Sequence, residues 1–169
     1  YISNEVKDRK HNSYLIDPLE YNLPILPKRF SDFEKDKISP NLDKLQKLFN
    51  TSDAFIIVSA EYNHMPPPAL INLINYFSSE YNRKPSSICT YSTGDLAGIR
   101  VQSSLRAMMC QLGSPAIKFG MFQPNIDKFF NNEGKPNDYN NAKKRFDLFF
   151  DELEWYAQIL KKERKITSC

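Results

Sequence analysis

The sequence predicts an α/β domain in which a parallel sheet is covered by helices on both sides. The run 54–58 is apolar, rich in β-branched residues and free of polar alternation, as strands buried on both faces are. Strand-like and helix-like segments then alternate strictly along the chain, which is typical of parallel sheets. The length of 169 residues and the 41% hydrophobic content suit a single domain with one sizeable core.

The N-terminal segments are short and polar. Residues 1–10 are interpreted as the end of a helix. A short strand is expected at 13–16, closed by Asp17 and Pro18, and an extended loop punctuated by prolines follows at 21–27.

The middle of the chain carries the clearest pattern. A helix is expected from Ser39-Pro40 to about Asn50, with one apolar face formed by Leu42, Leu45, Leu48 and Phe49. After the 54–58 strand and a polar loop come three prolines, which suit the entrance of a helix. The apolar spacing of that next helix is given by Leu70, Leu73, Ile74 and Phe77.

The second half is expected to continue the alternation of strands and helices. Gly113-Ser114-Pro115 is a typical helix stop between two of these elements. In order, they are a strand at 87–91, a loop at 93–98, a helix at 100–112, a short edge strand at 116–119, a polar loop at 129–140 and a helix at 141–162 with a broad apolar face.

The loop that follows the 54–58 strand is the first candidate functional site. It contains Glu61, Tyr62, Asn63 and His64. Ligands of α/β proteins bind outside the carboxyl ends of the strands, where such loops lie. Read alone, the same residues could form a plain polar turn with Tyr62 capping the core.

Two motifs resemble the NAD(P)H-dependent FMN reductase family, a flavodoxin-like group. Residues 59–64, Ser-Ala-Glu-Tyr-Asn-His, with the Pro-Pro-Ala-Leu of 67–70 and Asn72, are similar to that family's flavin loop. Residues 90–100, Thr-Tyr-Ser-Thr-Gly-Asp-Leu-Ala-Gly-Ile-Arg, with Leu105-Arg106, are similar to its second glycine-containing segment. Ala97 stands where the family has its second glycine.

The resemblance implies a flavodoxin-like fold with a parallel sheet in the strand order 2-1-3-4-5. The segments identified above supply strands 2 to 5. No segment matches the first, central strand or the Ser- or Gly-containing phosphate loop after it. The expectation is therefore one flavodoxin-like domain over 1–169 that is N-terminally incomplete.

The resemblance also implies FMN as cofactor and NADPH or NADH as co-substrate. Backbone N–H groups and flat aromatic surface in the two loops would hold the flavin ring. The implied cofactor-binding residues are Ala60, Glu61, Tyr62, Asn63, Ser92, Thr93, Gly94, Asp95 and Arg100.

Hydride transfer through a flavin needs no side-chain acid or base, so no catalytic residue is assigned. Arg100 and Arg106 could bind NADPH phosphates as planar bidentate donors, or could serve as ordinary surface ion-pair partners. His64 could contact a substrate, or could be a satisfied loop histidine.

The expected function is thus an NAD(P)H-dependent FMN reductase, an oxidoreductase that passes hydride through FMN to a quinone, a flavin or a similar small acceptor. The alternative is a non-catalytic flavodoxin-like electron carrier or protein-interaction module. Carrier flavodoxins are usually strongly acidic, whereas this chain has a formal net charge of +3.

Composition narrows the other possibilities. The charges are scattered, which does not indicate a nucleic-acid-binding stripe, and no apolar run is long enough to span a membrane. Cys89, Cys110 and Cys169 are unclustered and fit reduced thiols in a cytoplasmic protein, and no metal site is expected. A homodimer or homotetramer is expected, because Tyr76 and Tyr81 face away from the apolar side of the helix that begins after the prolines and would be exposed on a monomer.

Overall fold

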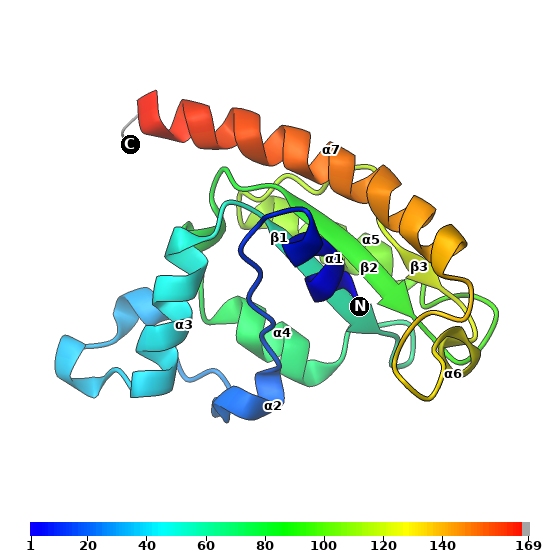
Figure 1. The fold of residues 1–169 in the computed structure, drawn as a ribbon. Coiled ribbons are helices and arrows are strands. Elements are labelled where there is room, and N and C mark those ends of the chain that lie inside the picture. The colour runs from blue at the N-terminus through cyan, green and yellow to red at the C-terminus, as the bar shows by residue number, and fades with distance from the viewer. Residues whose placement is uncertain (167–169) are drawn as a thin grey trace.

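The computed structural model describes residues 1–166, which fold around a parallel three-stranded sheet (Figure 1). The strands are β1 (Phe55–Ala60), β2 (Ser86–Tyr91) and β3 (Phe122–Gln123), in the order β1-β2-β3. β1 and β2 pair along their whole length, from Phe55 opposite Ser86 to Ala60 opposite Tyr91. The predicted parallel sheet is confirmed.

β1 differs from the strand predicted at 54–58 in one respect. Burial alternates along it, and the side chain of Val58 is 47% exposed. Phe55 and Ile57 are buried in the core on one face, while the packing on the other face covers Ile56 but does not include Val58. The expectation that this strand is buried on both faces is therefore wrong at its carboxyl end.

The strand expected at 13–16 is not formed. The chain there has no regular structure, and the side chains of Tyr14 and Leu15 are exposed, Leu15 by 78%. A short apolar run without a core to bury it gains nothing from a strand conformation. Asp17 instead caps the short helix α2 (Pro18–Tyr21), accepting a hydrogen bond from the backbone N–H of Leu19 at 2.9 Å.

One face of the sheet is covered by α2, α3 (Pro40–Thr51), α4 (Pro68–Asn75) and α5 (Val101–Gln111). The predicted start of α3 is confirmed, because the Ser39 hydroxyl accepts a hydrogen bond from the Leu42 N–H and Pro40 occupies the first turn. Two short 3₁₀ segments, η1 (Phe30–Asp32) and η2 (Lys35–Lys37), lie between α2 and α3, and a third, η3 (Ser79–Tyr81), lies between α4 and β2. The side chains buried in this half of the core are Tyr21, Leu42, Leu45, Phe49, Phe55, Ile57, Leu73, Ile74, Tyr76, Phe77, Tyr81, Ile88, Val101, Leu105 and Met109.

Tyr76 and Tyr81 are both 1% exposed within this core. Phe49 and Phe55 pack against the Tyr81 ring, and the Tyr76 hydroxyl donates to the carbonyl of Pro24 at 2.8 Å. The chain itself therefore covers the aromatic surface that was expected to be exposed next to the helix after the prolines. That argument for a dimer is wrong.

The other face is covered by α1 (Ile2–Asp8) and α7 (Tyr139–Ile166), and α6 (Ile126–Phe129) lies beside the end of β3. The long helix α7 was predicted over 141–162, and it extends a few residues beyond both limits. Its buried side chains in this half of the core are Ala142, Phe146, Phe149, Phe150 and Leu153. Ile88 and Cys89, adjacent in β2, belong to opposite halves, as the alternation of a strand requires.

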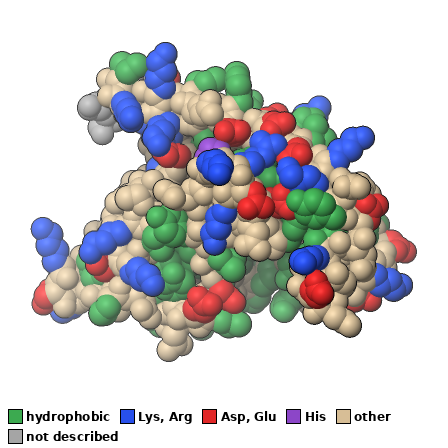
Figure 2. All heavy atoms as spheres, in the orientation of Figure 1, with side chains coloured by type: hydrophobic (Ala, Val, Ile, Leu, Met, Phe, Trp, Pro, Cys, Tyr) green, Lys and Arg blue, Asp and Glu red, His purple; other side chains and the backbone are tan. Residues whose placement is uncertain are grey.

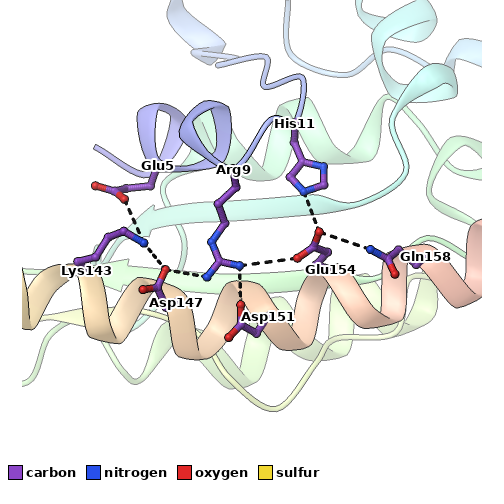
Figure 3. Close-up of polar contacts among 8 residues, drawn as sticks. All are labelled: Glu5, Arg9, His11, Lys143, Asp147, Asp151, Glu154 and Gln158. Carbon is purple, nitrogen blue, oxygen red and sulfur yellow. Dashed lines mark hydrogen bonds and ion pairs between the residues drawn. The ribbon is translucent and has the colours of Figure 1, made fainter.

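A network of charged side chains joins α1 to α7 (Figure 3). Arg9 contacts Asp147 at 2.7 Å and Asp151 at 2.5 Å, and its guanidinium lies over the ring of Phe150. His11 lies 3.0 Å from a carboxylate oxygen of Glu154. These contacts fix the N-terminal helix on the long C-terminal helix.

The edge strand expected at 116–119 is displaced along the chain. Ala116 makes only an isolated bridge to Ser86, and strand pairing with β2 begins at Phe122. Gly120 lies between these points, and a Cβ atom there would be 2.0 Å from the carbonyl oxygen of Ile88. This close backbone approach is a tertiary contact that local sequence pattern does not reveal.

None of the helices in residues 1–166 is both long and apolar enough to cross a membrane. The thiol of Cys89 is buried and that of Cys110 is exposed. Burial raises the pKa of Cys89 to about 12. Cys169 lies outside the described residues.

Candidate functional site

The two loops singled out from the sequence leave the sheet at the same edge (Figure 1). β1 and β2 are parallel neighbours, and their last residues, Ala60 and Tyr91, are register partners. The loops 61–67 and 92–100 therefore begin side by side, at the carboxyl ends of two adjacent strands. This is the position at which open α/β sheets bind ligands.

The first loop begins with a tight hairpin. The backbone N–H of Tyr62 donates to the carbonyl of Met65 at 2.9 Å, and the N–H of Met65 donates back to Tyr62 at 3.0 Å. Asn63 and His64 form the turn, with φ angles of 51° and 66°. This is the backbone of a type I′ turn, in which asparagine is favoured and a β-carbon at the second position is strained by about 1–2 kcal/mol.

This hairpin decides which backbone donors the loop can offer. The Tyr62 N–H is used inside the turn, whereas the N–H groups of Asn63 and His64 make no hydrogen bond within residues 1–166. The Tyr62 ring is 60% exposed, so it does not cap the core as the alternative interpretation required. The hairpin presents an aromatic face and two free donors to solvent.

The second loop lies against the end of β3. The Ser92 N–H donates to the carbonyl of Gln123 at 3.2 Å, and Asp95 accepts a hydrogen bond from the Asn125 side chain at 3.0 Å. Among residues 1–166, the N–H groups of Thr93, Gly94 and Asp95 have no acceptor. A Cβ atom on Gly94 would meet no atom within 4 Å, so this glycine leaves open space in front of the loop.

The departure from the family pattern at Ala97 has a structural consequence. Ala97 and Gly98 both adopt left-handed backbone conformations, with φ angles of 54° and 68°. The Thr90 hydroxyl donates to the Ala97 carbonyl at 2.7 Å and holds this turn. Ala97 is therefore a strained residue at a position where glycine carries no steric penalty.

Glu61 and Arg100 join the two loops. Arg100 Nη1 lies 3.4 Å from Glu61 Oε1, and His64 Nε2 lies 4.0 Å from the same oxygen. The other carboxylate oxygen of Glu61 is buried and has no hydrogen-bond partner within residues 1–166. A buried carboxylate oxygen without a donor is costly, which makes this atom a natural acceptor for a bound group.

Several apolar side chains at this edge were not singled out from the sequence. Met65, Leu96 and Ile99 are all at least 40% exposed, and the sulfur of Met65 lies 3.9 Å from the Ser104 hydroxyl on α5. The sequence feature that could have identified them is the presence of apolar residues inside otherwise polar loops. With Tyr62 they add exposed apolar surface to the two loops that carry the free N–H groups.

Arg106 has a different role from Arg100. Its guanidinium donates to the carbonyls of Ala116 at 3.1 Å and Lys118 at 2.8 Å. It thus holds the segment between α5 and β3 and is neither a surface ion-pair former nor free to bind a phosphate. The side chain of Arg100 is nearly half exposed, so Arg100 is the basic residue of the two loops that can offer its charge to a ligand.

Two cavities of the structure lie away from the loops 61–67 and 92–100. One of about 210 Å³ is lined by residues that follow α4 and by η1, and another of about 330 Å³ lies along α3. None of their lining residues comes from the 61–67 or 92–100 loops. The first is smaller than the usual pocket of a small-molecule ligand, and burial raises the pKa of Tyr76, one of its lining residues.

The edge of the sheet that carries the loops 61–67 and 92–100, named the loop edge from here on, fits the flavin-ring half of an FMN molecule. A flavin ring is flat and apolar on its faces and carries hydrogen-bond acceptors along its edges. Exposed Tyr62 and Met65, the free N–H groups of Asn63 and of 93–95, and the space in front of Gly94 match those requirements. The arrangement can bind such a ring and place the Arg100 cation beside it.

Comparisons with known proteins agree with this geometry. The structure is similar to FerB, a flavoenzyme NAD(P)H:(acceptor) oxidoreductase from Paracoccus denitrificans, with a TM-score of 0.68, 17% identity, and coverage of 95% of this chain and 86% of FerB. It is also similar to an oxidoreductase from Corynebacterium diphtheriae, with a TM-score of 0.60, 11% identity, and coverage of 95% and 81%. At these identities the likeness shows the fold, which is flavodoxin-like.

The sequence itself matches a family model. No curated protein matches the chain. The model of the NADPH-dependent FMN reductases, however, matches residues 1–125, a range that contains both loops. The chain therefore belongs to the NADPH-dependent FMN reductase family and is an oxidoreductase that uses FMN and NAD(P)H.

Proposed function

We propose that this reductase passes hydride equivalents from NAD(P)H through FMN to a quinone, a free flavin or a similar small acceptor. The observation that carries the proposal is the convergence of two loops, joined by Glu61 and Arg100, around exposed aromatic and apolar side chains at one edge of the sheet. FerB is an NAD(P)H:(acceptor) oxidoreductase, which supports an open choice of acceptor.

The flavin ring would lie between the two loops. FMN supplies hydride acceptance and release, so the chain's task is to bind, orient and polarise. Free N–H groups at Asn63 and 93–95 would donate to the ring edge, and Tyr62 would cover part of one face. The proposed contacts are Ala60, Glu61, Tyr62, Asn63, Ser92, Thr93, Gly94, Asp95 and Arg100.

Arg100 would hold an anionic part of NAD(P)H, such as a phosphate. Its side chain is half exposed, and its contact with Glu61 is long, at 3.4 Å, so an incoming phosphate can replace that contact. His64, which lies near the same carboxylate and is exposed, would border the same space. No side-chain acid or base is needed for the transfer.

Because both loops come from one edge of one small sheet, NAD(P)H and the acceptor would use the same space in turn. Two substrates that share a space cannot bind together productively. Double-reciprocal plots at several acceptor concentrations should therefore be parallel, as in a ping-pong reaction. Intersecting lines would show a ternary complex.

The rival function is a flavodoxin-like electron carrier or interaction module without turnover. The net charge of +3 does not favour docking on basic partners in the manner of acidic carriers. The membership in a reductase family also favours turnover. A protein that binds FMN but does not oxidise NAD(P)H would support the rival.

Two measurements test the proposal. The purified protein, titrated with FMN, should quench flavin fluorescence and retain a yellow cofactor that chromatography identifies as FMN. Stopped-flow reduction by NADPH and reoxidation by a quinone should then show that Arg100→Ala slows the first half-reaction more than the second. An Arg100→Ala variant slowed only in reoxidation would contradict the assignment of Arg100.

A further inference from the structure

The chain has two histidines, and their surroundings differ. Figure 2 shows basic and acidic side chains gathered where α1 meets α7, and Figure 3 shows His11 in that network. His11 Nε2 lies 3.0 Å from a carboxylate oxygen of Glu154, and the His11 ring packs edge to face on Phe150. These contacts give His11 a structural role.

His64 lies at the loop edge and is not held in this way. Its side chain is 66% exposed, and within residues 1–166 its ring nitrogens make no hydrogen bond. Its Nε2 comes only within 4.0 Å of Glu61 Oε1, the oxygen that Arg100 Nη1 approaches at 3.4 Å. The imidazole of His64 is therefore free to contact a molecule bound at the loop edge.

The backbone of His64 carries a cost that a smaller residue would avoid. Its φ angle is 66°, at the second position of the type I′ turn. Glycine is favoured at that position because it has no β-carbon, and it would hold the same turn without strain. Strained residues of this kind gather at functional sites, where the surrounding structure holds them in place. The strain at His64 therefore indicates that its side chain is used.

Reduction of a quinone needs a proton in addition to the hydride. The hydride brings two electrons and one proton, and the hydroquinone product carries a second proton on its other oxygen. Imidazole takes up and releases a proton near neutral pH. Carboxylic acids have given up this proton at neutral pH, and phenols and guanidinium groups release it far less readily. Of the residue types in the loops 61–67 and 92–100, histidine is therefore the one that suits this proton transfer.

We propose that His64 donates the second proton to the acceptor, an inference that rests on the proposed reduction of a quinone at the loop edge. An N–H bond of the His64 imidazolium breaks and leaves its electron pair on nitrogen. An O–H bond forms on the quinone oxygen that carries the negative charge after hydride transfer. His64 then regains a proton from water, which its exposure admits. Glu61, with Arg100 on the same oxygen, lies beside the ring that loses and regains this charge.

The kinetic test compares two acceptors in anaerobic stopped-flow experiments on the FMN-loaded protein after its reduction by NADPH. Tetramethylbenzoquinone needs a proton and does not add to thiols such as that of exposed Cys110, whereas ferricyanide takes one electron at a time and no proton. His64→Asn keeps the turn, because asparagine adopts left-handed conformations readily. It should lower the ratio of the quinone rate to the ferricyanide rate about tenfold or more. An unchanged ratio would overturn the inference.

Matched variants separate proton donation from effects on the fold. His64→Gly should lower the same ratio, and imidazole added to the solution should raise it again, because the free base can enter the space that the side chain leaves. This variant should also unfold at a higher urea concentration than the wild type, since the strained β-carbon is gone. His11→Asn removes the same ring from the α1–α7 network and should leave the ratio unchanged. A ratio that falls as far in His11→Asn as in His64→Asn would overturn the inference.

A binding measurement tests the contact without turnover. Nuclear magnetic resonance resolves the ring C–H signals of the two histidines, which His64→Asn and His11→Asn assign. Titration of the oxidised FMN-loaded protein with tetramethylhydroquinone should shift the His64 signals and leave those of His11 in place. His64 signals that do not move would overturn the inference. A wild type that ferricyanide reoxidises but the quinone does not would contradict the proposed acceptor as well, whereas equal ratios in a quinone-active wild type and both His64 variants would overturn the role of His64 alone.

Discussion

The interface between α1 and α7 and the loop edge of the sheet use charged side chains in opposite ways. Between the helices, Arg9 alone meets three carboxylates, those of Asp147, Asp151 and Glu154 (Figure 3). At the loop edge, one oxygen of Glu61 is buried without a partner. The first region is dense in ion pairs, and its one carboxylate oxygen that is buried without a hydrogen bond in the described chain, Glu5 Oε2, lies 3.8 Å from Lys143 Nζ. In the second region, Glu61 has only the long contacts with Arg100 and His64 within residues 1–166.

The α1–α7 interface and the loop edge also differ in how far their aromatic side chains are buried and in how many residues hold a strained backbone conformation. Beneath α7, Phe146 and Phe149 are fully buried and their rings pack edge to face. At the loop edge Tyr62 is exposed, and Asn63, His64 and Ala97 hold left-handed conformations that cost free energy, whereas beside the α1–α7 network Lys10 is the one described residue with a β-carbon that does so. The α7 side therefore stabilises the fold, whereas the loop edge keeps strained residues and unpaired polar groups that a bound ligand can satisfy.

The largest expected effect tests the stabilising side. Phe149→Ala should lower the free energy of unfolding by about 3–5 kcal/mol, because it removes a fully buried ring and leaves a cavity. Urea denaturation measures the change, and the FMN affinity of the folded protein should not change. A loss below about 1 kcal/mol would show that this half of the core does not hold the fold together.

A smaller effect is expected in the charged network. Asp147→Asn should lower the free energy of unfolding by about 1 kcal/mol at neutral pH, because Asp147 contacts both Arg9 and Lys143 near the surface. Asp36→Asn, at an exposed position on η2, is the control and should change nothing measurable.

The pH dependence of this difference has a definite sign. The hydrogen bond from Lys143 holds the pKa of Asp147 below its usual value, so the carboxylate stabilises the fold at pH values above the unfolded pKa of about 3.9. That stability is lost as the pH falls through the lower native pKa. Wild type and Asp147→Asn should therefore converge in acid; a difference that grows on acidification would refute this.

The smallest effect tests the strain at the loop edge. Ala97→Gly should raise the free energy of unfolding by about 0.5 kcal/mol, because relief of the left-handed conformation exceeds the extra entropy of an unfolded glycine. The same substitution at Ala107, exposed in the middle of α5, should lower it by about 1 kcal/mol. If both variants are destabilised equally, Ala97 is not strained.

Sequence pattern predicted the elements that bury long apolar runs. β1, β2, α3, α5 and α7 were found close to their expected limits, since each carries enough apolar residues at one period to fix its type. The short runs at 13–16 and 116–119 were misjudged. Their conformation depends on whether a tertiary neighbour accepts them, as the approach of Gly120 to Ile88 illustrates.

The sequence indicated the two loops of the candidate site but not their geometry, and the assignment of its residues stays a prediction. Glu61 and Arg100 are thirty-nine positions apart, so no local sequence pattern predicts that their side chains are in contact. The turn at Asn63 and His64 takes the Tyr62 N–H away from any ligand, which the order of residues alone did not indicate. The burial of Tyr76 and Tyr81 likewise depends on α3 and on the segment before it, both distant in sequence.

The most direct test of the central claim, that the loop edge holds the flavin ring, is the FMN affinity of Gly94→Val. A Cβ atom at Gly94 meets no protein atom within 4 Å, so the free energy of unfolding should change little, while the space in front of the loop is filled. Asn63→Asp, which adds a negative charge at the free donors of the hairpin, is the companion variant, and Ala107→Val on α5 is the control. Titrated by flavin fluorescence, both loop variants should bind FMN about tenfold more weakly or worse, a change of about 1.4 kcal/mol, and Ala107→Val should bind normally. Unchanged affinity in both loop variants would contradict the account.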